Sequence, residues 1–154
     1  MKSQQELSDR LEIQDLIIAY SYAIDFHRFD DLDEIFTSDA LLDFTATGGL
    51  AGPLPQIKEW LASVLTHFAG HQHLVATSSV KLAGNNATAR TICHNPMWFP
   101  DAEQPPMFVG LWYFDTLVRT PAGWRISRRI QQQGYLYGLP GAPMNHRAKI
   151  TNGN

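Results

Sequence analysis

The chain carries three histidines close together in its middle part, His71, His73 and His94. Imidazole can take up or release a proton near neutral pH because its unperturbed pKa is about 6.5. Three such rings would also be enough for zinc, but no clear carboxylate or cysteine completes a ligand set beside them. Glycine-rich motifs for nucleotide phosphates are missing as well. We therefore predict acid–base chemistry that needs no metal and no organic cofactor.

The single cysteine and the aromatic residues also bear on a possible site. Cys93 lies next to His94 in an apolar stretch, which favours a buried structural thiol over a nucleophile. Aromatic side chains are numerous for so small a domain, and a few of them should shape a pocket for a flat hydrophobic ligand. We expect three of them to bind substrate: Trp60, Phe68 and Trp98.

Helices are expected to position these residues from the N-terminal side. Apolar residues recur at spacings of three and four from residue 4 to about residue 26 and predict a long first helix. A short second helix is expected at Phe29–Phe36, and a third at Pro55–Phe68, where proline suits the first turn. Between these two helices, Ala40–Phe44 is typical of a short strand.

After Gly70 the sequence pattern becomes that of long β-strands. Turn residues divide this part into four expected strands: His71–Leu82, Ala87–Phe99, Met107–Thr120 and Trp124–Tyr137. Helices followed by antiparallel strands are typical of an α+β domain, in which the helices pack on one face of a curved sheet. We predict one domain over residues 1–140 and a tail containing proline and glycine over residues 141–154.

The composition excludes several classes of function. The 154-residue chain has a formal net charge of −3 and only 18% charged residues, which favours a hydrophobic interior, a pocket or a subunit interface. No basic stretch exceeds two adjacent residues, so nucleic-acid binding is not expected. No apolar run approaches the roughly 20 residues of a membrane span. A polar N-terminus and a single cysteine lead us to expect a cytoplasmic protein.

Four short segments also occur in a characteristic order: Ile13–Ile17, Ala23–Asp25, Phe29–Phe36 and Arg119–Ile126. Their order and spacing resemble the SnoaL-like branch of the nuclear transport factor 2-like superfamily, over roughly residues 6–137. The resemblance implies a cone-shaped α+β barrel, in which three N-terminal helices pack on a strongly curved, mostly antiparallel sheet. It also implies a homodimer or homotrimer with the sheet face as the expected interface.

The resemblance implies site residues as well. Within the branch, the chain is similar to scytalone dehydratase, bile-acid 7α-dehydratase and hexachlorocyclohexane dehydrochlorinase, which share an aspartate near the end of the first helix and a histidine that opens the first long strand. Asp25 and His73 stand at these positions. Tyr20 matches a tyrosine of the bile-acid dehydratase, and His94 matches a second pocket histidine of scytalone dehydratase. Arg129 matches a late-strand arginine that the bile-acid dehydratase and the dehydrochlorinase share.

The chemistry implied by this resemblance is elimination. Asp25 would orient His73 and stabilise its imidazolium form. Tyr20, His94 or Arg129 would polarise a carbonyl or stabilise an oxyanion. We predict a cofactor-independent lyase that removes water, halide or a small aldehyde from a hydrophobic aromatic or alicyclic small molecule. An isomerase resembling ketosteroid isomerase or a polyketide cyclase, and a non-catalytic small-molecule-binding protein, remain the alternatives.

Structural roles remain open for the same residues. Asp25 could simply end its helix, and His94 could be a hydrogen-bonded core histidine. Tyr20 lies five residues from Asp25, ~140° around a regular helix, and could therefore point into the core. Arg129 could form a salt bridge at a strand edge or subunit interface. We expect His71 to be an exposed strand residue.

Overall fold

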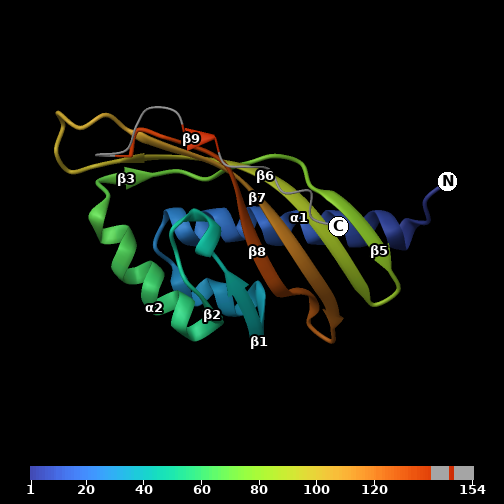
Figure 1. The fold of residues 1–154 in the computed structure, drawn as a ribbon. Helices are drawn as coiled ribbons and strands as arrows, with labels where there is room; N and C mark the ends of the chain where they lie inside the picture. Colours follow the sequence, from blue (N-terminus) through green and yellow to red (C-terminus); the bar gives the residue numbers. More distant parts are fainter. Residues whose placement is uncertain (140–145, 148–154) are drawn as a thin grey trace.

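A long helix, α1 (Gln4–Asp25), begins the fold and lies along one face of a curved sheet (Figure 1). The computed structural model describes residues 1–139 and 146–147 of the chain. The helix begins with a capping box, in which the Ser3 hydroxyl accepts from the Glu6 N–H at 3.1 Å and the Ser3 N–H donates to the Glu6 carboxylate at 2.7 Å. These two bonds satisfy backbone groups that the first turn would otherwise leave unpaired. None of the described helices is long and apolar enough to cross a membrane.

Short elements connect α1 to the main part of the sheet. In chain order they are the 3₁₀ helix η1 (Phe29–Glu34), strand β1 (Phe36–Asp43), the 3₁₀ helix η2 (Thr45–Thr47), strand β2 (Ala51–Pro53), helix α2 (Leu54–Val64) and the 3₁₀ helix η3 (Leu65–His67). The expected second helix therefore ends earlier than predicted, and the following strand begins earlier. The reason is sheet pairing, since Phe36 is already paired with Ile126 of the late strand.

The remaining strands build one sheet, which Figure 1 shows curving around α1. They are β3 (Gly70–His71), β4 (Leu74–Val75), β5 (Ser79–Ala83), β6 (Asn86–Trp98), β7 (Met107–Thr120), β8 (Gly123–Tyr137) and β9 (His146–Arg147). The strand order is β2-β1-β8-β7-β6-β3, while β4 and β5 also pair with β6 and β9 pairs with β8. Among the strands that the structure describes, every pairing is antiparallel except that of β1 with β8. The predicted α+β class, with helices on a mostly antiparallel curved sheet, is confirmed.

One expected strand is broken in a way that matters for the site. The stretch predicted as a single strand, His71–Leu82, forms the three short strands β3, β4 and β5 instead. His73 falls between β3 and β4 and is not a member of either strand. Its backbone N–H is therefore free to bond a side chain instead of a neighbouring strand. The predicted tail, residues 141–154, lies outside the described residues apart from the two residues of β9.

Candidate functional site

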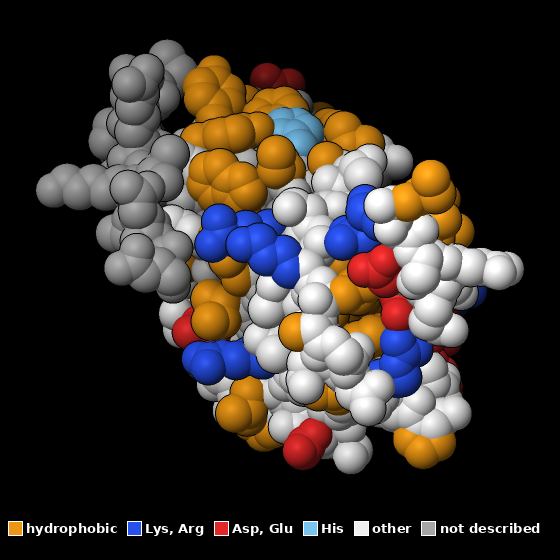
Figure 2. Space-filling model, turned by 90° about the vertical axis from the view of Figure 1, so that its right-hand side faces the viewer, with side chains coloured by type: hydrophobic (Ala, Val, Ile, Leu, Met, Phe, Trp, Pro, Cys, Tyr) orange, Lys and Arg blue, Asp and Glu red, His pale blue; other side chains and the backbone are white. Residues whose placement is uncertain are grey.

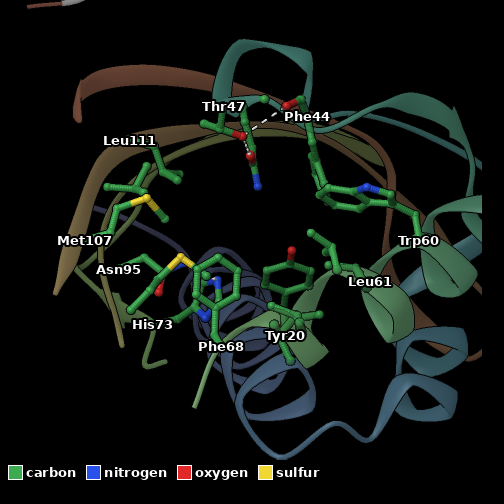
Figure 3. Close-up of a pocket in the computed structure, with 17 residues that line it drawn as sticks. Tyr20, Phe44, Thr47, Trp60, Leu61, Phe68, His73, Asn95, Met107 and Leu111 are labelled. Carbon is green, nitrogen blue, oxygen red and sulfur yellow. Dashed lines mark hydrogen bonds between the residues drawn. The ribbon is translucent and has the colours of Figure 1, made fainter. Parts of the chain in front are cut away.

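A cavity of about 160 Å³ lies between α1, α2 and the inner face of the sheet (Figure 3). Most of its wall is apolar and comes from α1, α2, the short helices η2 and η3, and strands β6, β7 and β8. Two of the aromatic residues expected to bind substrate, Trp60 and Phe68, are part of this wall. The polar side chains of the wall are Tyr20, Thr47, His73, Asn95 and Gln131. An apolar cavity with a few polar groups is the usual form of a small-molecule site.

Asp25 and His73 are bound to each other beside this cavity. Asp25 is the last residue of α1, and its Oδ1 lies 2.7 Å from His73 Nδ1. The backbone N–H of His73 donates to the other carboxylate oxygen, Oδ2, at 2.8 Å. Both oxygens are thus held by one residue, which fixes the carboxylate and the imidazole ring relative to each other.

The charge of Asp25 is stable at neutral pH. Although burial raises the pKa of this carboxyl group, hydrogen bonds from His71 and His73 hold it well below its usual range. An ionised carboxylate only accepts hydrogen bonds, so Nδ1 of His73 must carry the ring hydrogen. The lone pair of a neutral His73 is therefore on Nε2, the atom that lies 3.3 Å from the Asn95 side-chain amide nitrogen. That atom is placed to act as a base toward a molecule in the cavity.

Tyr20 adds a hydroxyl group to the same cavity. Its ring packs edge-on against His73, with 6.2 Å between ring centroids, and its hydroxyl points into the open space (Figure 3). Burial raises the pKa of Tyr20 to about 12, even though the nearby charge of Arg129 lowers it. The hydroxyl group is therefore protonated at neutral pH and can donate a hydrogen bond to a ligand.

Comparison with known proteins agrees with this architecture. A family model of the SnoaL-like domain matches residues 5–130. The chain belongs to this SnoaL-like family. An uncharacterised relative from Mycobacterium tuberculosis is 52% identical over 131 residues, which are 85% of this chain and 89% of that protein.

Solved structures of similar proteins share the fold of this SnoaL-like chain. A scytalone dehydratase-like protein from Novosphingobium aromaticivorans aligns with a TM-score of 0.78 and 22% identity, over 94% of this chain and 97% of that chain. A hexachlorocyclohexane dehydrochlorinase aligns with a TM-score of 0.77 and 18% identity, over 94% of this chain and 96% of that chain. At this level of identity the likeness shows the fold alone, which the chain also shares with a nuclear transport factor 2-like superfamily protein from Salmonella enterica at a TM-score of 0.73 and 17% identity, over 90% of this chain and 99% of that chain.

Arg129, which was expected in the site, lies beneath it. The side chain is fully buried and donates from Nε and Nη2 to the two oxygens of Asp115, both at 2.7 Å. Its guanidinium carbon lies 4.1 Å from the ring centroid of Tyr20 and 4.2 Å from that of Tyr113. Arg129 does not line the cavity, whereas Tyr20, whose ring it contacts, does.

The structure does not bring His94 and Trp98 to the cavity. Odd-numbered residues of β6 face inward, as the burial of Cys93 and Asn95 shows, and even-numbered residues face outward. His94 stacks on Phe108 with 5.7 Å between ring centroids, and Trp98 is 45% exposed. Figure 2 shows hydrophobic side chains and a histidine gathered on one outer side of the molecule. On the outer face of β6, His94 and Trp98 cannot contact a ligand in the cavity.

Several residues of the site were not expected. Only 3% of the side chain of His71 is exposed, and its Nδ1 lies 3.3 Å from Asp25 Oδ1. His27 follows α1 in a left-handed conformation with φ of 55°, and its Nε2 lies 3.0 Å from His71 Nε2. The strand pattern did not indicate that His71 and His73 would contact the same carboxylate, because His73 lies outside the strands. Nothing in the sequence pattern marked His27 or Asn95.

The same cluster supplies the carboxylate that a metal site seemed to lack. Ligand atoms of Asp25, His71 and His73 all lie within 4.8 Å of one another. Two imidazoles and one carboxylate are a donor set that divalent transition metals accept. The Asp25–His73 pair is therefore part of a larger cluster that can serve either proton transfer or metal binding.

Proposed function

We propose that this protein is a lyase that eliminates a leaving group from a hydrophobic aromatic or alicyclic small molecule in the cavity. The position of His73 is the observation that carries this proposal. Its ring lines the cavity while its Nδ1 is held 2.7 Å from the Asp25 carboxylate. A carboxylate in this position orients the imidazole and stabilises the imidazolium that forms when Nε2 takes a proton. The names of the dehydratase-like and dehydrochlorinase neighbours agree with this reaction class.

The reaction begins when Nε2 of His73 removes a proton from the carbon next to the one that bears the leaving group. The electron pair of that C–H bond becomes the new carbon–carbon double bond, and the leaving group departs with its own bonding electrons. Where the leaving group is hydroxide, the imidazolium returns the proton to it and water is released. Tyr20 donates a hydrogen bond to the substrate oxygen on which negative charge develops. No oxidant, reductant or cofactor enters this balance.

An isomerase that uses Asp25 itself as the base fits the geometry less well. Asp25 does not line the cavity. Its Oδ1 already contacts the Nδ1 atoms of His71 and His73, and its Oδ2 accepts from the His73 backbone. The carboxylate thus has no oxygen directed at a ligand, whereas His73 lines the cavity and the contact of its Nε2 with the Asn95 amide is long, at 3.3 Å.

A substrate screen tests the proposal. Aromatic and alicyclic alcohols, halides and β-hydroxycarbonyl compounds are incubated with the protein, and mass spectrometry detects products that have lost water or hydrogen halide. His73→Ala is the test variant, and His94→Ala is the matched control because it removes a histidine from the outer face. We expect His94→Ala to form product like the wild type and His73→Ala to form almost none. Equal product formation by wild type and His73→Ala would contradict the proposal.

A further inference from the structure

We propose that Asp25, His71 and His73 also form a zinc-binding site, and that zinc bound there blocks the base. Asp25 Oδ1 lies 2.7 Å from His73 Nδ1 and 3.3 Å from His71 Nδ1. Ligands in a tetrahedral zinc site are roughly 3.3 Å apart when the zinc–ligand bonds are about 2.0–2.1 Å long. Both distances to the carboxylate oxygen are therefore close to this spacing, all the donor atoms lie within 4.8 Å of one another, and both imidazoles point at the same oxygen. An ion could replace the two N–H hydrogens that now lie between them.

Zinc binding through both Nδ1 atoms sets a condition on the opposite ring nitrogens. Each neutral imidazole must then carry its hydrogen on Nε2, and that N–H needs an acceptor. For His71 the acceptor is His27, because the two Nε2 atoms lie only 3.0 Å apart. The left-handed backbone of His27 holds the ring stacked on His71, with 5.2 Å between their centroids.

For His73 the acceptor is Asn95. Its side-chain oxygen, Oδ1, is buried and has no hydrogen-bond partner among the described residues, while its nitrogen lies 3.3 Å from His73 Nε2. The oxygen and nitrogen of such an amide exchange places by a half-turn of the side chain. After that turn, Oδ1 accepts from the His73 Nε2–H. The turn gives Oδ1 a partner and moves the amide nitrogen to the position that has none, so the side chain keeps one hydrogen bond in either orientation and can accept as readily as it donates.

The ion would lie on the side of His73 away from the cavity. Neither Asp25 nor His71 lines the cavity, whereas His73 and Asn95 do. Bound zinc would keep a hydrogen on Nε2 of His73 and so remove the lone pair that faces the ligand. Zinc would therefore inhibit the elimination reversibly, a consequence that rests on the proposed function, while the metal site itself does not.

Zinc titration of the chelator-treated full-length protein tests the site. Isothermal titration calorimetry with zinc chloride should show one equivalent bound to the wild type and to the control His94→Ala. Asn95→Leu should weaken zinc binding by about 10–100-fold, as is usual for loss of a partner of a metal ligand. His71→Gln, which removes a ligand, should weaken it further. Binding of cobalt(II) with the absorption bands of tetrahedral coordination would support the same site.

Two controls keep the outcome clear. Zinc should raise the unfolding temperature of the wild type but not that of His71→Gln, whose own unfolding curve reports whether it folds. Wild-type affinity in His71→Gln, or no bound zinc in the wild type, would overturn the inference and leave the proposed function untouched. Zinc binding that depends on His71 but leaves turnover unchanged would support the metal site and contradict the role of His73 as the base.

Discussion

Asp115 and Asp25 each bind a basic side chain near the cavity, and the two pairs differ in what remains free. Asp115 and Arg129 are 3% and 0% exposed and form a two-bonded ion pair between the rings of Tyr20 and Tyr113. Asp25 holds His73, whose far side reaches the cavity. A buried charged pair can stabilise or position its neighbours, but neither Asp115 nor Arg129 lines the cavity where a ligand would bind. A pair that leaves one ring nitrogen at an apolar cavity can move a proton.

The largest effect on activity is expected from a substitution in the Asp25–His73 pair. We expect His73→Ala to lower kcat/KM by about 10³–10⁴-fold, the upper range for removal of a general acid or base and equivalent to about 4–5.5 kcal/mol. The fold should persist, because His73 lies outside the strand ladders. Steady-state kinetics on the substrate found by the screen measures the loss, with circular dichroism as the check on folding. A loss smaller than tenfold would mean that another group is the base.

Disrupting the Asp115–Arg129 pair should instead lower the stability of the fold. Arg129→Met leaves Asp115 charged, buried and unpaired, so we expect the free energy of unfolding to fall by about 3–5 kcal/mol in urea denaturation. Replacing both partners, as Arg129→Met with Asp115→Leu, should recover part of that loss because no lone charge remains. If Arg129→Met keeps wild-type stability but loses activity more than 100-fold, Arg129 has the catalytic role that the family resemblance implied.

Tyr20 connects the two pairs, and its hydroxyl should have an intermediate effect. Tyr20→Phe keeps the ring between His73 and Arg129 but removes the hydrogen-bond donor, so we expect kcat to fall by about 100-fold with little change in stability. Because the pKa of Tyr20 is raised to about 12, the hydroxyl should stay protonated and active up to about pH 11. A wild-type basic limb well below this pH that disappears in Tyr20→Phe would contradict the assignment.

The outer face should give the smallest effect. His94→Ala and Trp98→Ala change side chains that do not line the cavity, and we expect each to alter kcat/KM by less than about twofold. The measurement is the same kinetic assay, carried out at a protein concentration that keeps the oligomeric state constant. A tenfold loss of kcat/KM in His94→Ala would show that His94 contributes to the site despite its position on the outer face of β6.

The sequence was enough to predict the α+β fold, because helix periodicity and turn residues are local signals. The Asp25–His73 contact depended on family motifs, and the structure places the two residues together. Strand faces were harder to predict. His94 and Asn95 are neighbours on β6, and the choice of which one faces inward depends on where the pairing of β6 with β7 begins. The contacts of His71 with Asp25 and His27 join segments that are distant in sequence. Local sequence patterns carry no information about such contacts.

The most direct test of the central claim is a double-mutant cycle of Asp25→Asn and His73→Ala, measured as kcat on one substrate. Asp25 is proposed to act only through His73, so its contribution should vanish once the imidazole is gone. We predict that the double variant is little slower than His73→Ala alone, although Asp25→Asn by itself costs a large part of the rate. Losses that multiply in the double variant would show that the two residues act independently, and the coupled dyad proposed for this cavity would be wrong.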